Sequence, residues 1–421
     1  MNATADIPPF GQTHAALRRT TERLAVELST PQESAPAWNE FEWQVARAAA
    51  SMQGITVLLA SRLRWRGPAS WQEFLAAQCH GSRQRQVHID VTLERIDDVL
   101  REAGVACVAL KGSALRYLNI YQAGERPMAD VDLLARPADA PRVEQALQSL
   151  GYVARYRMRR HVVFELQRRA ATTVFGEHPD NPLKIELHQR IAEQLPSWPV
   201  DITASLWSDA MNPGLVAYPH ARELMRHLLL HAAGNMRGHA LRQIQLHDIA
   251  LLSGRLTGED WQALLDARES LGGTWWMWPV LELTARYYPD ALPARCTGFR
   301  TRCPPLLRAA SARNSLTSVS WSNLRIAAFP GLCWSRSARE AVGFMRSRLF
   351  PRRDALDELG FALDAMPVLR TVRWYGENHF QRVLRWTFSR PPRVQTLCSV
   401  LNAIAARPTG SWRSSPGLPP G

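Results

Sequence analysis

The stretch Val-Ala-Cys-Val-Ala-Leu-Lys-Gly-Ser at residues 105–113 joins a short apolar run to a glycine-containing turn. The β-branched, apolar run at 105–110 predicts a buried strand, and Lys111-Gly112-Ser113 predicts a turn into a helix. The first turn of a helix presents free backbone N–H groups and the positive end of the helix dipole, which favour a phosphate. We therefore expect a phosphate-binding turn that begins at Lys111.

Two acidic residues follow in a strand-like run, Ala-Asp-Val-Asp-Leu-Leu-Ala at residues 129–135. Asp130 and Asp132 are two residues apart, so strand geometry places both carboxylates on one face. A second strand-like run at 183–187 carries Glu186. Three carboxylates on adjacent strands beside a phosphate-binding turn are a ligand set suited to Mg²⁺-dependent phosphoryl transfer. The sequence therefore predicts a Mg²⁺ site formed by these three residues.

Three further side chains near this core each fit two roles. Arg126 fits a contact with a triphosphate, and it also fits a salt bridge to Asp132 or Glu186. His188 is expected on the same strand face as Glu186, either in the pocket or as a partner that orients a carboxylate. Ser113 fits a phosphate ligand or a helix N-cap.

Lysine usage singles out the same segment. The chain has 51 basic residues, and all of them except Lys111 and Lys184 are arginine, as expected when a GC-rich genome replaces lysine. One interpretation is that Lys111 supplies a compact ammonium beside a phosphate, where the broader guanidinium does not fit. The other is coincidence combined with local packing. We interpret Lys184 as structural.

The ordered motifs resemble the nucleotidyltransferases of the DNA polymerase β superfamily, and more closely a poorly characterised bacterial group of nucleotidyltransferase family proteins. The resemblance covers roughly residues 41–287. Asn235 departs from the pattern, because relatives tend to carry a second histidine there. The motifs that carry the resemblance are Leu110-Lys111-Gly112, Arg126 to Asp132, Glu186-Leu187-His188, Leu228 to His231 and Asp248-Ile249.

The resemblance implies transfer of a nucleoside monophosphate from a triphosphate, expected to be ATP, to a hydroxyl acceptor with release of pyrophosphate. It implies that Asp130 and Asp132 hold Mg²⁺ and that Glu186 completes the second metal site and helps to deprotonate the acceptor. Catalysis would then rest largely on positioning and charge neutralisation. The acceptor stays open between a small molecule, a peptide and tRNA. The nucleotide-binding residues expected on this basis are Lys111, Gly112, Ser113, Arg126 and His188.

Four histidines and an aspartate lie in a helical segment after residue 200. His227 and His231 are four residues apart, a spacing that places two imidazoles on one helical face for a metal. No glutamate follows His227 as in zinc proteases, so we favour packed or capping histidines over a metal site. The resemblance implies instead that this region closes over the nucleotide, with His231 or Asp248 lining or bracing the pocket. The five residues are His227, His231, His239, His247 and Asp248.

Hydrophobic patterning predicts an α+β protein with a small mixed-sheet core between helical regions, and the resemblance implies that this core is polymerase β-like. Within the core we expect a helix at 137–151 and strands at 152–156, 161–167 and 171–175, with His161 and Glu165 at a strand edge near the site. Helices are expected at 337–349 and 354–365. The expected parts are a flexible leader at 1–36 with a short helix near 17–28, a helical region at 37–102, the core at 103–192, a helical domain at 193–295, and a basic helical region at 296–421 with a disordered tail.

Composition predicts a cytoplasmic protein. The 421 residues contain no apolar run of about 18 residues, and the first ten residues lack a signal-peptide pattern. Hydrophobic residues make up 46% of the chain, enough for sizeable cores. The six cysteines show no paired zinc spacing and fit reduced thiols better than disulfides.

The net charge of +13 comes entirely from residues 296–421, which hold 19 arginines, no lysine and six acidic residues. Because the arginines are scattered, we favour a solvated helical surface over a nucleic-acid surface.

Two alternatives to a nucleotidyltransferase with a hydroxyl acceptor stay open: a toxin-like nucleotidyltransferase that acts on tRNA, and a non-catalytic nucleotide- or RNA-binding module. The intact carboxylate set argues against the second, because like charges without a metal are costly to bury.

Overall fold

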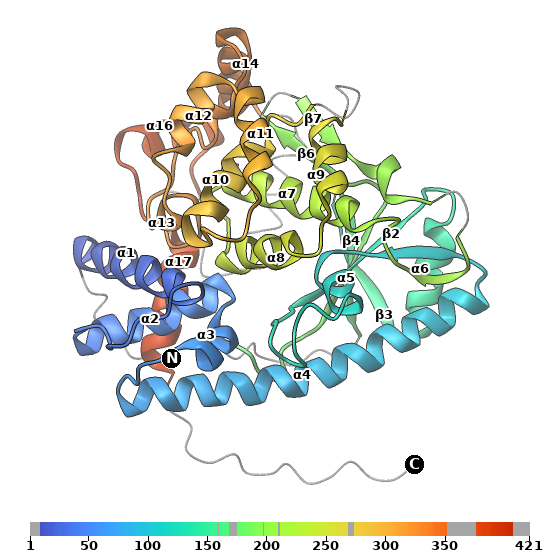
Figure 1. Cartoon of the computed structure of the whole chain (residues 1–421), viewed down its shortest axis with the longest axis horizontal. Helices are drawn as coiled ribbons and strands as arrows, with labels where there is room; N and C mark the ends of the chain where they lie inside the picture. Colours follow the sequence, from blue (N-terminus) through green and yellow to red (C-terminus); the bar gives the residue numbers. More distant parts are fainter. Residues whose placement is uncertain are drawn as a thin grey trace.

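A computed structural model gives the architecture of the chain (Figure 1). Helices from both ends of the chain lie on one side and the mixed sheet lies on the other, with further helices between them (Figure 1). The residues that it describes are 9–158, 160–167, 175–196, 198–208, 211–267, 273–351 and 376–406.

The centre of the core is a six-stranded sheet with strand order β3-β4-β5-β2-β1-β8. β2 pairs with β5 in parallel and β1 pairs with β8 in parallel, whereas the other neighbours are antiparallel. This mixed sheet with flanking helices confirms the predicted α+β class. The strands are β1 (Ala106–Ala109), β2 (Asp130–Ala135), β3 (Tyr152–Arg157), β4 (His161–Leu166), β5 (Lys184–His188) and β8 (Gly214–Val216).

The two faces of the sheet differ in character. Odd-numbered residues of β2 and β5, such as Val131, Leu133 and Ile185, are buried in a core with α6 (Ala140–Ser149) and the C-terminal half of α4 (Ala69–Glu102). The opposite face carries the acidic residues and faces the helical half of the chain. The alternation expected for β2 is therefore observed, and it separates an apolar core from a polar site.

The N-terminal helices are α1 (Phe10–Glu27), α2 (Glu40–Gln53) and α3 (Thr56–Arg62), followed by α4. A capping box of Asn39 and Glu42 starts α2, and Gly54 ends it with a φ of +68°. The 34-residue α4 runs from these helices to the sheet (Figure 1). Its N-terminal half contributes Trp71 and Phe74 to the helical core, and its C-terminal half contributes Leu93 and Ile96 to the sheet core.

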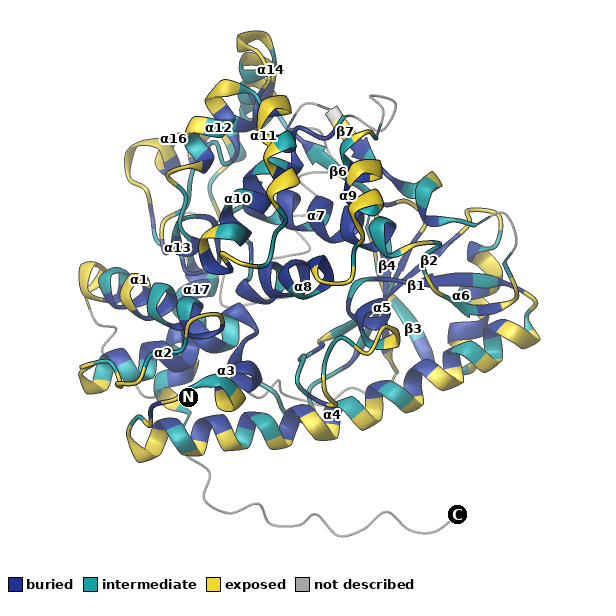
Figure 2. Cartoon of the chain, in the orientation of Figure 1, coloured by how far each residue is buried: buried dark blue, intermediate teal, exposed yellow. Residues whose placement is uncertain are grey.

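The C-terminal half of the chain is mostly helical, and its central helices are largely buried (dark blue in Figure 2) in a core shared with the sheet and the N-terminal helices. The last helix returns to the first two, because Val400 and Ala403 share a buried cluster with Ala16 and Leu17. The helices are α7 (Ala221–Arg237), α8 (Gln243–Ser253), α9 (Gly258–Leu265), α10 (Met277–Tyr287), α11 (Thr297–Arg302), α12 (Pro305–Ser311), α13 (Leu316–Val319), α14 (Ala338–Leu349), α16 (His379–Phe388) and α17 (Val394–Ala405).

Two expectations about the organisation are corrected. Most of the expected flexible leader is the packed helix α1, whose Leu17 is fully buried. The sheet also extends past residue 192, because a hairpin of β6 (Ala192–Leu195) and β7 (Trp198–Asp201) leads to β8, which the helical expectation missed. Strands of three or four residues are too short to show a periodicity in the sequence.

Other expectations met different outcomes. The helix predicted at 337–349 is confirmed by α14. The predicted helix at 354–365, the tail from residue 407 and most of the predicted strand at 171–175 lie outside the described residues. Among the helices that are described, none combines the length and apolar character needed to cross a membrane.

We expect Leu17→Ala to lower the free energy of unfolding by about 2–5 kcal/mol, because it opens a cavity in a closed core. Urea denaturation of the purified chain measures the change. The matched variant Leu306→Ala removes a leucine that is 63% exposed and should cost less than about 0.5 kcal/mol. Equal effects of the two variants would mean that α1 is not part of the folded core.

Candidate active site

The three predicted carboxylates lie on one face of two paired strands. In the parallel register of β2 and β5, Asp132 is opposite Glu186 and Asp130 is opposite Lys184. Asp132 is only 5% exposed, whereas Asp130 and Glu186 are partly exposed at the edge of the polar face. The structure thus brings together the acidic residues that strand periodicity grouped.

The turn after β1 holds Lys111 over these carboxylates. The backbone N–H of Leu110 donates to the carbonyl of Asp132 at 2.9 Å, and Lys111 follows in the left-handed region with a φ of +46°. Its ammonium donates to Asp132 Oδ1 at 2.8 Å. Burial would lower the pKa of Lys111, but the charges of Asp132 and Asp130 raise it. The cation therefore stays charged and neutralises part of the acidic cluster.

Two histidines complete the polar face. His188 Nε2 lies 3.0 Å from Asp132 Oδ1 and 3.6 Å from Glu186 Oε2, which confirms that His188 shares the face of Glu186. His161 comes from β4, where it pairs with His188, and its Nε2 lies 3.6 Å from the same Glu186 oxygen. The expected placement of His161 near the site is also observed, and its neighbour Glu165 lies farther along the same face beside Lys184.

Burial and mutual repulsion act differently on the carboxylates. Burial and the neighbouring charge of Asp132 raise the pKa of Asp130 to about 6. Burial would also raise the pKa of Asp132, but Lys111 and His188 hold it well below its usual range. Asp130 is thus the carboxylate whose charge the protein alone compensates least, and an added cation would stabilise its ionised form.

The glycine-serine turn differs in detail from the expected helix start. Leu110, not Ser113, is the N-cap of the short helix α5 (Lys111–Tyr117), and the backbone N–H of Ser113 donates to the Leu110 carbonyl at 3.1 Å. Ser113 Oγ is fully buried and has no hydrogen-bond partner within the part of the chain that is described. A Cβ on Gly112 would lie 2.5 Å from Arg126 Nη1, so glycine lets the guanidinium approach the turn.

Arg126 makes a salt bridge, but not with the expected partners. Its Nε and Nη2 donate to the two carboxylate oxygens of Asp248 on α8, at 2.8 and 2.7 Å. Tyr121 donates to Asp248 Oδ1 at 2.6 Å. Burial would lower the pKa of Arg126, but Asp248 raises it. The expectation of a bridge to Asp132 or Glu186 is therefore wrong, and Asp248 instead braces the arginine from the helical half.

Two side chains that no sequence pattern indicated also border the site. Arg242, the N-cap residue of α8, is close enough to Asp130 for its charge to lower the pKa of that carboxyl. Tyr218 accepts a hydrogen bond from the backbone N–H of Lys111 at 3.3 Å, and its hydroxyl lies 2.6 Å from His227 Nδ1. Neither belongs to a recognisable spacing, and Arg242 was one of many arginines in the chain.

The histidines of α7 and α8 do not gather around a metal position within the described ranges. Burial, followed by the charge of Lys111, lowers the pKa of both His227, to about 3, and His231. Both rings are therefore neutral, and they lie close enough to Lys111 to feel its charge. His231 Nε2 is 3.2 Å from the amide nitrogen of Asn235, the residue that departs from the family pattern. The favoured interpretation as packed histidines agrees with this arrangement.

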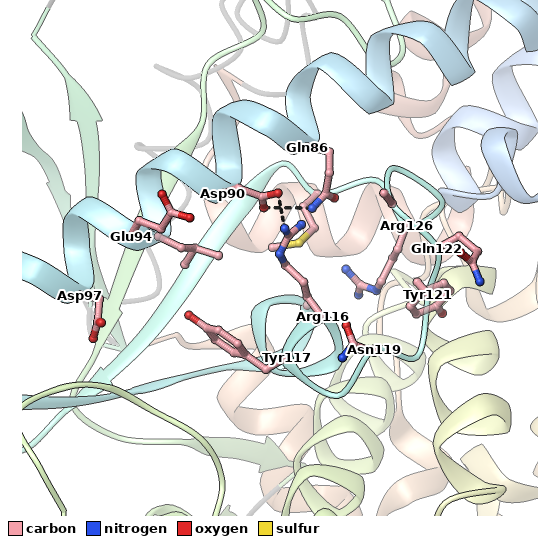
Figure 3. Close-up of a pocket in the computed structure, with 14 residues that line it drawn as sticks. Gln86, Asp90, Glu94, Asp97, Arg116, Tyr117, Asn119, Tyr121, Gln122 and Arg126 are labelled. Atoms are coloured by element: carbon pink, nitrogen blue, oxygen red, sulfur yellow. Dashed lines mark hydrogen bonds and ion pairs between the residues drawn. The ribbon is translucent and has the colours of Figure 1, made fainter.

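A cavity of about 550 Å³ adjoins the turn on its other side. It lies between α4, α5 and the segment 119–128, and shares Gly112 and Arg126 with the site. Figure 3 shows Asp90, Glu94 and Asp97 on α4 facing this space across from α5, with Asp90 paired to Arg116. Such a volume is typical of small-molecule sites.

Comparisons with known proteins agree with these observations. Residues 39–289 match the model of a protein family described as uncharacterised nucleotidyltransferase. No curated protein and no solved structure matches the chain significantly. The matched range contains all three carboxylates, the Lys111 turn and Asp248.

We expect Asp248→Asn to lower the free energy of unfolding by about 3–5 kcal/mol, because Arg126 would keep a buried charge without its counterion. Asp248 is only 1% exposed in its side chain. Urea denaturation measures the loss, and Glu33→Gln in the exposed Arg64–Glu33 pair is the control, expected to change stability by less than about 1 kcal/mol. A loss no larger than that of the control would show that the buried pair is not formed.

Stability should also fall with acid because of His247, whose two ring nitrogens are buried and have no hydrogen-bond partner among the described residues. Burial, followed by the charge of Arg62, lowers its pKa from 6.5 to about 4. The unfolded chain then binds the extra proton, so the free energy of unfolding decreases by up to about 3 kcal/mol as pH falls from about 6.5 to 4. Chemical denaturation across this range should show a shallower decrease for His247→Leu. The exposed His220→Leu should keep the wild-type dependence, and identical profiles for all three proteins would refute the expectation.

Proposed function

We propose, because this chain belongs to the family of uncharacterised nucleotidyltransferases, that it transfers the nucleoside monophosphate of ATP to a hydroxyl acceptor with the help of Mg²⁺. Family membership makes the chain a transferase of nucleotidyl groups; the donor, metal and acceptor are parts of the proposal. One observation carries it: Asp130, Asp132 and Glu186 share one face of two paired strands, beneath the Lys111 turn.

The donor set suits magnesium. Carboxylate oxygens are the hard ligands that Mg²⁺ prefers, and substrate phosphates usually complete its coordination. The raised pKa of Asp130 indicates carboxylate charge that the protein leaves uncompensated. In the proposal Asp130, Asp132 and Glu186 are the metal ligands. Bound Mg²⁺ would neutralise phosphate charge and polarise the α-phosphate.

The turn supplies the groups that meet the phosphates. We assign this role to the ammonium of Lys111, the backbone at Gly112 and the hydroxyl of Ser113, which has no hydrogen-bond partner in the described ranges. Arg126 adds a positive charge whose position is fixed by Asp248, so little conformational freedom is lost when the nucleotide binds. These residues hold the triphosphate in line for attack on its α-phosphorus.

The remaining site residues serve proton transfer and pocket shape. Glu186 is partly exposed and accepts the proton of the acceptor hydroxyl in this proposal. His188 orients Asp132 through its 3.0 Å contact and closes the nucleotide pocket on that side. His231 and Asp248 support the pocket from the helical half, one beside the turn and the other through Arg126.

The adjoining cavity supports a small polar acceptor. Its lining is mixed, with acidic and amide side chains facing Arg116 and Arg126. Its volume of about 550 Å³ suits a small molecule better than a folded RNA. Because Gly112 lines both the cavity and the turn, an acceptor bound in the cavity would have its hydroxyl directed toward the α-phosphate. We therefore favour a small molecule over a peptide or tRNA.

The tRNA alternative gains little support from the basic C-terminal half. Several of its arginines are engaged in contacts within the protein: Arg336 pairs with Glu340, Arg348 donates to the Ala328 carbonyl, and Arg393 donates to the His239 carbonyl. Such arginines are partly used for packing rather than for phosphates.

We retain a cytoplasmic location as a proposal, in keeping with cysteines that form no disulfide among the described residues.

Binding of ATP with Mg²⁺ should stabilise the wild type by about 2.7 kcal/mol when the nucleotide is at a hundredfold excess over its Kd. Thermal unfolding measures this as a rise in Tm that needs both components. The double variant Asp130→Asn/Asp132→Asn should lose the rise because it lacks the metal ligands. No rise in the wild type with any nucleoside triphosphate would rule out the proposed donor site.

The two lysines of the chain offer a matched pair of controls. Lys111→Arg should lose most of the Mg²⁺-dependent rise in Tm, because the broader guanidinium replaces a compact ammonium in a nearly closed space. Lys184→Arg, at a side chain that is 42% exposed beside Glu165, should retain it. Retention in both variants would exclude Lys111 from phosphate binding.

A further inference from the structure

We propose that His161, Glu186 and His188 form a site for a divalent transition-metal ion at the second metal position of this centre. The inference rests on the proposed function for its catalytic meaning, but not for the binding itself. It refines that proposal by leaving Asp130 and Asp132 to Mg²⁺ and assigning to the position of Glu186 an ion such as Co²⁺, Mn²⁺ or Zn²⁺.

The donor atoms converge on one point. The Nε2 atoms of His161 and His188 each lie 3.6 Å from Glu186 Oε2, and the ligand atoms of the three residues all lie within 4.8 Å of one another. A separation of 3.6 Å is too long for a hydrogen bond. Two ligands bound at about 2.1 Å to one ion lie about 3.0–3.5 Å apart, in cis or tetrahedral positions. Small side-chain adjustments would therefore seat an ion among the three donors.

Asp132 lies beside this group without belonging to it. Its Oδ1 lies 3.0 Å from His188 Nε2, at hydrogen-bond distance, so it helps to orient that imidazole. Its other partner is the Lys111 ammonium, which donates to the same oxygen at 2.8 Å. In the proposal Asp132 therefore stays with Asp130 as a ligand of Mg²⁺.

The strand pairing fixes this geometry before any ion binds. His161 is opposite His188 in the antiparallel register of β4 and β5, and their rings lie 4.9 Å apart between centroids. Glu186 lies two residues before His188 on the same face. Ligands on paired strands lose little freedom on binding, so the site is pre-organised.

Imidazole nitrogen decides which ion fits. Mg²⁺ prefers oxygen donors and keeps several waters, whereas two imidazoles with carboxylates suit first-row transition ions. The side chains of His161, Glu186 and His188 are 17%, 22% and 10% exposed, so a solvent ion can reach them and water can fill its open positions. The chemistry of the donor set therefore separates this position from the all-carboxylate one.

Cobalt titration of the full-length, metal-free chain without nucleotide tests the inference, because the visible absorption of Co²⁺ reports nitrogen ligands directly. We expect one equivalent to bind with visible bands, at least tenfold more tightly than Mg²⁺ binds at the same position. His161→Gln and, separately, His188→Gln should each weaken Co²⁺ binding at least tenfold and alter the bands. His220→Gln, an exposed histidine, should leave both unchanged.

Circular dichroism of each variant verifies that the fold is kept. Because the two histidines are replaced separately, the test still works if one variant fails to fold. Co²⁺ binding that is unaffected by both His161→Gln and His188→Gln overturns the inference, as does displacement of Co²⁺ by equimolar Mg²⁺. The ATP-dependent rise in Tm is a separate readout. If that rise is absent while histidine-dependent Co²⁺ binding persists, the proposed function fails and the metal site stands; the reverse pattern removes the metal site alone.

Discussion

The parallel pairing of β2 with β5 is the constraint on which the site depends. Because side chains alternate along a strand, this register places Asp132 opposite Glu186 on the polar face and sends Val131 and Ile185 into the sheet core. A slip of one residue would exchange the two sets, burying carboxylates among aliphatic side chains. The apolar face therefore enforces the register that assembles the acidic face. Stability of the core and geometry of the site are specified by the same alternation.

The helical half of the chain controls the other side of the site. α8 reaches the turn through the Asp248–Arg126 pair, and α7 reaches it through His227 and Tyr218, whose hydroxyl meets the backbone of Lys111. Buried ion pairs add little net stability because desolvation offsets the attraction. Their value here is geometric, since the paired guanidinium cannot turn toward the acidic cluster. The turn is thereby held between the sheet and the helical half by contacts on both sides.

Local patterns predicted what local geometry determines. Strand alternation grouped Asp130, Asp132 and Glu186, and the α+β class followed from the apolar run, the turn and the helical periodicities. Long-range pairing was out of reach: nothing near Arg126 in the sequence indicates Asp248, and nothing near Asp130 indicates Arg242. Short strands such as β8 carry no periodicity, and the packed helix α1 resembled a leader because its burial depends on tertiary contacts with α2 and with the distant α13. Sequence reveals which side chains share an element, whereas tertiary contacts decide which elements share a site.

Lysine at position 111 suits its contact with the acidic cluster. The ammonium contacts Asp132 through Oδ1 at 2.8 Å, and as a point charge it can leave that oxygen without repacking. A guanidinium at this position would bind both carboxylate oxygens in a fork and hold them against any arriving metal. Asp132 could then neutralise the arginine or coordinate an ion, but not both in turn. If Asp132 binds the proposed ion, this position therefore favours a lysine in a chain whose other cations are almost all arginine.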